Sequence, residues 1–465
     1  MKRYANFEKI RFITLTKWVV ALGLPIIFCF LPVGLKDNIQ IYLAITLWAI
    51  LMWMFELLPE SIIGILIPVF YLLSGVATTD QAFMGWASSV PWVTLGGIII
   101  GAVMMTSGLA KRIAYKVLSI TGNSLIGIIV GISITAFIIT PFIPSIMGKV
   151  SLMVPLVIGI CQALKIEPKS KTASTLMLVV FFSLWSPKMA FLTASADSIL
   201  LSGVLGQYLG LHVSWAQWAF EMFVPSFIWT IVSLCLVFFL RPNKVAFENK
   251  EVFTKYVELG PVSKDEKKAI ILLIILLIIL ATDSIHKIDS AWTMILMASL
   301  SFVPGIDLLK KSDIQKINFP IVFFLAGALA IGNLAKVTGT VDLISKAILP
   351  VLQGKSELFI VLTTWLFGVL STFILNPLAA ISALAVPMAE IFSSLGYNPY
   401  VGGYALIMGF NHAIFPYQIA PLMLVYGYGY LKLNDLIKVM ILRVIVGFIF
   451  MLGIVYPYWK LIGLF

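Results

Sequence analysis

Three ionisable residues interrupt long apolar runs of this sequence, and they are the first candidates for its chemistry. Lys149 follows a segment broken by Pro141 and Pro144, and Lys188 and Asp197 lie inside an apolar stretch that Pro187 breaks. A charge in such a stretch costs several kcal/mol unless it is paired or hydrated, so it usually serves a function. A buried lysine supplies a fixed positive charge, and we therefore expect Lys149 and Lys188 to contact an anion.

Each of these residues also has a structural interpretation. The ammonium group of Lys149 could reach the cytoplasmic surface along its aliphatic chain. Lys188 and Asp197 could form a purely structural ion pair. If Asp197 is functional instead, its carboxylate could carry a proton.

Polar residues beside the prolines offer further contacts for an anion. Ser145 lies between Pro144 and Lys149, and Thr193 follows Lys188 in a segment rich in Thr, Ser and Ala. A helix that starts near Ser145 would point free N–H groups and a positive dipole end at an anion. In the second half, Asn376 precedes a proline and is not expected inside a helix. Asn376 is equally compatible with a helix cap.

A second unwound stretch is predicted at residues 411–421, where two prolines follow Asn411 and His412. His412 could titrate near neutral pH, although a lone histidine is more often a packing residue. The same stretch contains Gln418, whose amide is a polar group in an apolar context.

The overall composition restricts the class of protein. The chain has 465 residues, of which 60% are hydrophobic and 11% charged, and its mean hydropathy is +1.04. These values exclude a soluble enzyme, a disordered chain and a coiled coil, and they predict a multi-span membrane protein. The formal net charge of +11 is explained by basic cytoplasmic loops rather than by nucleic acid. No nucleophile–base pair, Walker lysine or metal-binding cluster is apparent, so the sequence predicts neither an enzyme nor a cofactor.

The spacing of the apolar runs predicts an all-α polytopic membrane protein with about eleven transmembrane helices. Runs near 124–148 and 358–377 end in Pro, Ser, Asn or Gly clusters, which is typical of re-entrant hairpins. A long charged segment at 241–268 is expected to be a cytoplasmic linker between a first half, residues 1–240, and a second half, residues 269–465. The basic start of the chain places the N-terminus in the cytoplasm.

The two halves repeat one pattern. Gly108 is followed by a broken segment and Pro155, and Gly339 is followed by a broken segment and Pro387. With a cytoplasmic linker between them, the halves are expected to be inverted repeats. Paired interrupted segments of this kind indicate the substrate site of a secondary transporter at the membrane midplane.

Several segments resemble the divalent anion/sodium symporter family, which carries di- and tricarboxylates and sulfate. They are Trp-Met-Phe-Glu-Leu-Leu-Pro at 53–59, Ser-Gly-Leu-Ala-Lys-Arg-Ile-Ala at 107–114 and Phe-Phe-Leu-Ala-Gly-Ala-Leu-Ala at 323–330. Residues 142–149 and 191–194 look most like the branch of citrate/succinate antiporters and plastid 2-oxoglutarate/malate translocators. The resemblance implies an elevator-like movement of the hairpins and, in many members, a homodimer.

The resemblance also implies that the hairpin tips hold carboxylate and sodium, here near Ser145 and Asn376. Each Ser-Asn-Thr triplet of the family is reduced, to Ser145-Ile-Met and to Leu-Asn376-Pro, and Ala420 stands where the family has proline. Polar sodium ligands are therefore fewer. We expect a lysine to replace part of the sodium charge, which favours anion exchange or proton coupling.

The sequence thus predicts a secondary active transporter of organic anions, such as succinate, malate, 2-oxoglutarate or citrate, in the cytoplasmic membrane. It would work by exchange or by cation-coupled symport. Alternatives are a sodium-coupled symporter of another divalent anion such as sulfate, and a passive anion channel. The residues assigned to substrate contact are Ser145, Lys149, Lys188, Thr193, Asn376 and Ala420. Those assigned to ion coupling are Asp197, Ser371 and Gln418.

Overall fold

The computed structural model describes residues 2–122, 124–210, 212–242 and 250–465, with side chains from residue 14 onward and, in the last range, from residue 252. These residues form helices joined by loops and contain no strand. Seven helical segments are long and apolar enough to cross a membrane, and five shorter apolar helices accompany them. The all-helical membrane architecture is confirmed, whereas these segments do not establish the expected number of eleven spans.

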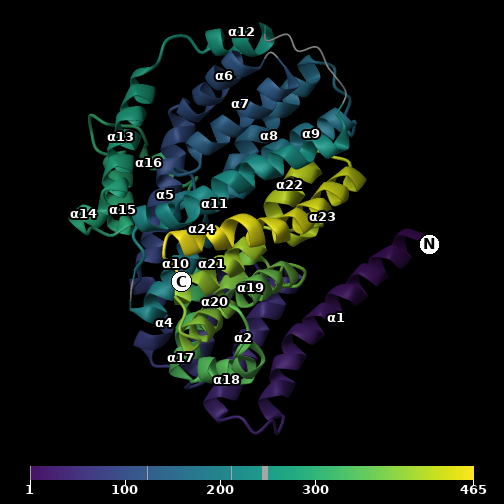
Figure 1. Cartoon of the computed structure of the whole chain (residues 1–465), viewed down its shortest axis with the longest axis vertical. Coiled ribbons are helices and arrows are strands. Elements are labelled where there is room, and N and C mark those ends of the chain that lie inside the picture. Colours follow the sequence, from purple (N-terminus) through teal and green to yellow (C-terminus); the bar gives the residue numbers. More distant parts are fainter. Residues whose placement is uncertain (1, 123, 211, 243–249) are drawn as a thin grey trace.

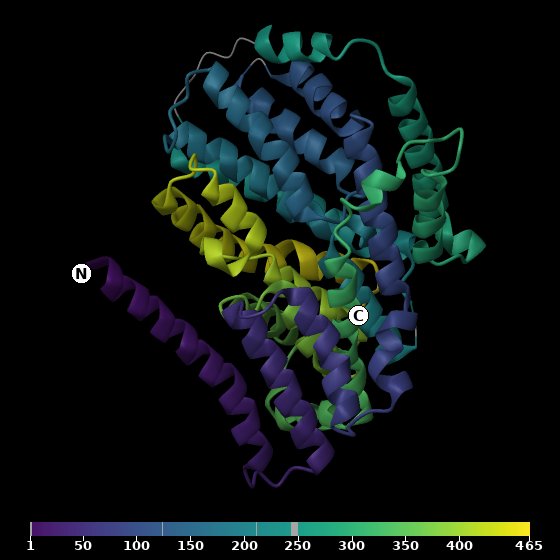
Figure 2. The same ribbon diagram turned by 180° about the vertical axis from the view of Figure 1, so that it is seen from behind.

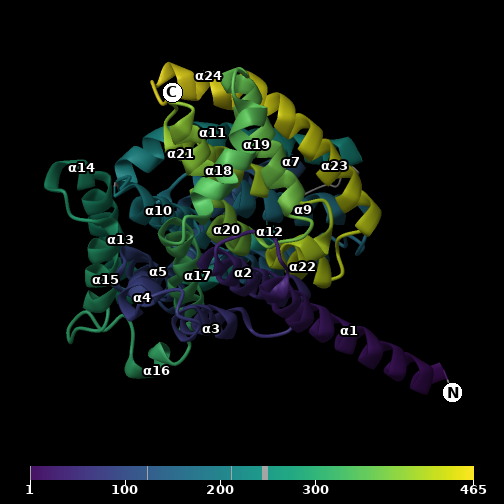
Figure 3. The same ribbon diagram turned by 90° about the horizontal axis from the view of Figure 1, so that it is seen from below.

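The helices of the first half are α1 (Lys2–Phe30), α2 (Asp37–Phe55), α3 (Glu60–Leu73), α4 (Thr79–Ala87), α5 (Ser89–Thr106), α6 (Leu109–Thr121), α7 (Leu125–Ile139), α8 (Ile146–Ala163), α9 (Lys171–Trp185), η1 (Ser186–Met189), η2 (Leu192–Ala194), α10 (Ala196–Leu209), α11 (Trp215–Leu236) and η3 (Val237–Leu240). The N-terminal part of α1 projects away from the other helices, as Figures 1 and 3 show, whereas α1 packs against α2.

The helices of the second half are α12 (Lys250–Glu258), α13 (Lys264–Ala281), α14 (Asp283–His286), α15 (Ser290–Leu300), α16 (Lys311–Ile314), α17 (Pro320–Val337), α18 (Thr340–Leu352), α19 (Glu357–Ser371), α20 (Pro377–Ser394), α21 (Pro399–Phe410), η4 (Pro416–Gln418), α22 (Ala420–Gly427), α23 (Leu433–Phe450), η5 (Met451–Val455) and α24 (Tyr456–Leu461).

The order of elements recurs between the halves. Helices α6 and α18 both have 13 residues and follow a glycine in the left-handed conformation, Gly108 (φ 81°) and Gly339 (φ 79°). Next come α7 and α19 with 15 residues each, and then α8 and α20 with 18 residues each. Helices α8 and α20 each contain an internal proline, Pro155 or Pro387. The recurrence agrees with the internal repeat that the sequence predicts.

Both predicted interruptions in the apolar runs are short loops between two helices. The first loop joins α7 to α8, and the second joins α19 to α20. Each second helix begins at a polar cap: the Ser145 hydroxyl accepts a hydrogen bond from the Gly148 N–H, and the Asn376 amide oxygen accepts one from the Ala379 N–H. Such caps satisfy donors that the first turn of a helix leaves free. The sequence of each loop therefore ends one helix and starts the next.

The centre of the molecule is formed by α9 and α21. Every residue from Thr172 to Trp185 in α9, and from Tyr400 to Phe410 in α21, is buried. Both helices are buried on all sides and are mostly apolar, as expected for helices without a solvent-exposed face. Helices α7 and α8 both pack against α9, and α19 and α20 both pack against α21. Each pair of hairpin helices therefore packs against the buried helix of its own half.

The linker expected at 241–268 is only partly a free loop. Residues 243–249 lie outside the described part of the chain, but α12 packs against α6. The Arg112 guanidinium of α6 forms an ion pair of 2.6 Å with Glu266 and donates to the carbonyl groups of Leu259, Gly260 and Pro261. The end of the linker is thereby fixed to α6. Figure 2 shows this side of the molecule, with α13 beyond the linker.

Candidate anion site

Lys149 is completely buried in the first turns of α8. Its Nζ donates to the backbone carbonyl of Ala194 at 3.0 Å. The alternative that its ammonium group extends to the surface is therefore wrong. The contact joins the first hairpin tip to the unwound stretch between α9 and α10.

Lys188 and Asp197 form a buried ion pair across that same stretch. Lys188 lies in η1, and Asp197 lies in the first turn of α10, where the helix dipole favours a negative charge. The Lys188 ammonium group also lies 3.3 Å from the centroid of the Trp185 ring. The ion pair between Lys188 and Asp197, which was the structural interpretation of these residues, is thus present.

Thr193 connects three elements around the first hairpin tip. Its hydroxyl donates to the carbonyl of Pro141 at 2.8 Å and accepts a hydrogen bond from the Trp215 indole N–H at 3.1 Å. The structure therefore gathers five of the predicted site residues around the loop before α8 and the stretch 186–197. They are Ser145, Lys149, Lys188, Thr193 and Asp197.

The second hairpin tip holds Asn376, whose side-chain N–H group donates to the Glu60 carboxylate of α3 at 3.1 Å. Ser371 ends α19 and donates to the Gly368 carbonyl at 2.8 Å. No hydrogen bond among the described residues joins Asn376 or Ser371 to Lys149. These two residues belong to a separate tip.

Gln418 organises the unwound stretch that follows α21. Its side-chain oxygen accepts from the backbone N–H groups of Ile414 and Phe415, and its nitrogen donates to the Thr372 hydroxyl at 2.8 Å. Gln418 thus binds this stretch to the second hairpin tip. Ala420 is the exposed first residue of α22 and has no polar side chain to contribute.

Arg443 of α23 is the main site residue that sequence reasoning missed. It is 1% exposed, and its Nε and Nη2 donate to the hydroxyl groups of Ser233 and Ser186 at 3.1 and 3.0 Å. It also lies over the rings of Phe182 and Trp229. Among the described residues, no carboxylate forms an ion pair with this guanidinium. The feature of the sequence that could have indicated Arg443 is a single arginine within an apolar run.

Asn411 joins the two unwound stretches. Its backbone carbonyl, at the end of α21, accepts from the Trp185 indole N–H at 3.0 Å and from Arg443 Nη1 at 2.5 Å. Its side-chain oxygen accepts from Arg443 Nη2 at 2.7 Å. The free carbonyl groups at a helix end carry partial negative charge and stabilise a cation there. Arg443 is therefore held by dipoles and not by a counter-charge.

Positive charge exceeds negative charge around these stretches. The positive charge of Lys188 is close enough to Lys149 and to Arg443 for electrostatic repulsion between them. All three are almost fully buried, and among the described residues Asp197 is the one carboxylate paired with them. Buried charges are costly without counter-charges. The arrangement is chemically suited to a dianion, which would balance the excess.

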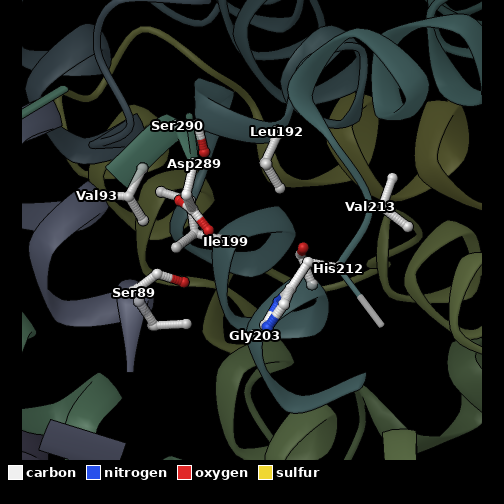
Figure 4. Close-up of a pocket in the computed structure, with 11 residues that line it drawn as sticks. Ser89, Val93, Leu192, Ile199, Gly203, His212, Val213, Asp289 and Ser290 are labelled. Atoms are coloured by element: carbon white, nitrogen blue, oxygen red, sulfur yellow. The ribbon is translucent and has the colours of Figure 1, made fainter. Parts of the chain in front are cut away.

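A small cavity lies beside this region, between α5, the segment 192–203 and the start of α15 (Figure 4). Its volume of about 30 Å³ suits one or two water molecules and not an organic acid. None of the predicted site residues lines it, although Leu192 adjoins Thr193. The residues that line it are Ser89, Val90, Val93, Leu192, Ile199, Ser202, Gly203, His212, Val213, Asp289 and Ser290.

Comparisons with known proteins agree with this architecture. Residues 11–465 match the family described as sodium:sulfate symporter transmembrane region. Dicarboxylate transporter 1 of Arabidopsis thaliana chloroplasts is 23% identical over 96% of this chain and 82% of that protein. The sodium-dependent dicarboxylate transporter SdcS of Staphylococcus saprophyticus is 21% identical over 88% of this chain and 84% of that protein.

A solved structure shares the fold. The YdaH transporter of Alcanivorax borkumensis superposes with a TM-score of 0.60 at 13% identity, over 87% of this chain and 99% of that one. The family match covers almost the whole length, and the relatives are membrane transporters rather than enzymes. The chain therefore belongs to the divalent anion/sodium symporter family, as its sequence motifs predicted.

Proposed function

We propose that the protein is a secondary active transporter of dicarboxylates and tricarboxylates, such as succinate, malate, 2-oxoglutarate or citrate. The observation that carries this proposal is the group of buried cations, Lys149, Lys188 and Arg443, which is paired with one carboxylate. A dianion bound between them would be neutralised in a region of low dielectric constant, where unpaired charges are costly. Ser145 and Thr193 supply hydroxyl groups beside these cations, and Asn376 would reach the substrate from the second tip.

The transport movement is proposed to be elevator-like, with the helices around α9 and α21 moving as one body. Each hairpin packs against the central helix of its own half. Asn411 and Arg443 link the two unwound stretches. Residues 1–240 and 269–465 would be inverted repeats, and α20, with Ala420 at the start of α22, would complete the substrate site.

Coupling is proposed to be anion exchange or cation symport. Sodium, as a co-substrate, prefers oxygen ligands, and Ser145, Asn376, Ser371 and Gln418 provide hydroxyl or amide oxygen atoms near the two tips. Within the described ranges, no group of three or more His, Cys, Asp or Glu residues gathers to hold a metal ion. Asp197 is already paired with Lys188, so an added anion, more than an added cation, improves the charge balance.

A second candidate function is sodium-coupled symport of sulfate or another divalent anion, favoured by the description of the matching family. A passive anion channel is the third. We propose that the protein lies in the cytoplasmic membrane with its N-terminus in the cytoplasm, because basic residues gather at the start of α1 and in the linker. We expect it to form a homodimer, as the resemblance implies.

The test is counterflow in proteoliposomes. Vesicles preloaded with unlabelled succinate should accumulate external labelled succinate, because a carrier that takes unlabelled succinate out brings labelled succinate back in. In a channel, internal succinate does not stimulate the uptake of external succinate. The same assay with sulfate, and with and without a sodium gradient, separates the candidates. Strict sodium dependence together with full activity of Lys149→Ala would overturn the proposal that lysine replaces sodium.

A further inference from the structure

Glu221 is a buried carboxylate that the proposed anion site does not use. It lies in the second turn of α11 and is 5% exposed. Its Oε2 accepts a hydrogen bond from the Tyr404 hydroxyl at 2.5 Å, and its Oε1 accepts one from the Gln217 amide at 2.9 Å. Both donors are neutral. In the part of the chain that the structure describes, no Lys, Arg or His forms an ion pair with Glu221.

The other titratable groups around Glu221 are tyrosines. Tyr404 and Tyr400 face it from α21, and Tyr458 faces it from α24. Trp459 of α24 donates its indole N–H to the Glu221 backbone carbonyl at 3.2 Å. Lys460 of α24 is exposed and forms an ion pair with Glu357, so it does not balance an ionised Glu221.

Charged residues on the remaining neighbours of α11 bond partners other than Glu221. Asp283 of α14 caps the start of α11 at Trp215, and Arg443 of α23 bonds Ser233. Ser233 is 12 residues beyond Glu221, which corresponds to about 18 Å along a helix. Lys188 of η1 is paired with Asp197. Glu221 is thus isolated between these charges.

An isolated carboxylate in an apolar span is much more stable when it is neutral, because burial penalises its charged form. We propose that Glu221 is a proton-binding site and that its protonation is coupled to the binding of the anion. This inference rests on the proposed function, since the proton would move together with a dicarboxylate. Gln217, one helical turn away, is exposed and brings the carboxylate within one side chain of the surface.

The coupling has a short structural route. Tyr404, which bonds Glu221, packs edge-on against Trp218 with ring centroids 5.2 Å apart. The Trp218 indole N–H donates to the carbonyl of Met189 at 2.9 Å, next to Lys188. A protonated Glu221 leaves the positive excess around Lys188 intact, whereas an ionised Glu221 offsets part of it. Binding of a dianion therefore favours proton uptake, and by linkage a proton favours binding of a dianion.

The test compares Glu221→Gln, Glu221→Asp and the control Glu390→Gln in proteoliposomes. Glu390 suits the control because it also accepts a hydrogen bond from a tyrosine, Tyr208, but is half-buried. Lowering the external pH by one unit should raise succinate uptake by the wild type and by Glu390→Gln about fivefold. Glu221→Gln, which mimics the protonated form, should exchange succinate without that dependence, and Glu221→Asp should retain it with a shifted midpoint. An unchanged pH dependence in Glu221→Gln would overturn the inference.

Infrared spectroscopy of the purified protein tests the proton site independently of transport. A carboxylic acid C=O band that titrates with pH should be present in the wild type and in Glu390→Gln and absent from Glu221→Gln. Absence of the band from the wild type would refute the site even if succinate were carried. A titrating band without any succinate exchange would overturn the proposed function and leave the proton site intact. Uptake driven by sodium instead of protons, and lost in Glu221→Gln, would identify a sodium site and refute the inference.

Discussion

Arg443 binds both oxygen atoms of Asn411, with its Nη1 on the backbone carbonyl at 2.5 Å and its Nη2 on the side-chain oxygen at 2.7 Å. This bidentate contact fixes the end of α21 against α23. Through Ser186, the same guanidinium reaches the unwound stretch of the other half. One cation therefore sets the relative position of the two stretches that we assign to the anion.

Replacement of Arg443 should damage both stability and transport. Arg443→Met removes the donor to the Asn411 side-chain oxygen and one of the two donors to the Asn411 backbone carbonyl, together with the contacts to two serine hydroxyl groups. This loss should destabilise the fold by about 3 kcal/mol or more. Arg443→Lys keeps the charge but not the bidentate geometry, and should recover part of the stability. The thermal midpoint in detergent measures both effects. Lys438→Met, an exposed change on the same helix, is the control, and an equal loss there would contradict the prediction.

Gly447 should tolerate no side chain. A Cβ there would overlap His412 Nε2, and His412 is enclosed by Trp229 and Trp365, with ring centroids 5.1 Å away in both cases. Gly447→Ala should therefore cost about 1–3 kcal/mol through overpacking. Gly453→Ala, where a Cβ meets open space, should be neutral in the same thermal assay. A Gly447→Ala variant with an unchanged thermal midpoint would contradict the tight packing of Gly447 against His412.

The ion pair between Lys188 and Asp197 should respond differently to single and double replacement. Asp197→Asn leaves a buried ammonium group without its partner and should cost about 3–5 kcal/mol. The double variant Lys188→Met with Asp197→Asn removes both charges and should be clearly more stable than the single variant. Thermal melts of the three proteins measure the difference. A double variant that is no more stable than Asp197→Asn would contradict the prediction that the two charges neutralise each other in the folded protein.

Arg112 should stabilise the attachment of the linker to α6. Arg112→Met removes the ion pair with Glu266 and three contacts to carbonyl groups, and we expect a loss of about 1 kcal/mol. Limited proteolysis should then cut the segment 250–262 faster. Lys111→Met replaces the exposed neighbour and should leave the cleavage rate unchanged. Equal rates in the wild type and Arg112→Met would contradict the role of this contact.

Local sequence signals predicted the interruptions and the ionisable residues nearest to them. Prolines and caps end helices through short-range effects, so the tips near Ser145 and Asn376 could be located from the sequence. Asn376 bonds Glu60, which is 316 residues away, and no local pattern indicates such a contact. The same limit applies to the link between Trp185 and Asn411, which brings the two halves together.

Arg443 and Glu221 were missed for a physical reason. In the sequence each stands near the start of an apolar run, where a charge is usually read as the boundary of a span. In the structure, α23 begins ten residues before Arg443 and α11 begins six residues before Glu221. Both side chains are therefore well inside their helices. Both residues look like boundary charges in the sequence, and the positions of the helix starts in the structure show that they are buried.

Equilibrium binding to the purified protein tests the central claim most directly, namely that the excess of buried cations selects a dianion. Labelled succinate and the monoanion butyrate, which has the same carbon chain length, should be compared on the wild type and on Lys149→Met, with Lys171→Met as the exposed control. We predict that the wild type and Lys171→Met bind succinate at least about tenfold more tightly than butyrate, which corresponds to about 1.4 kcal/mol. Lys149→Met should lose that preference. Equal affinity of the wild type for both acids, or an unchanged preference in Lys149→Met, would contradict the account.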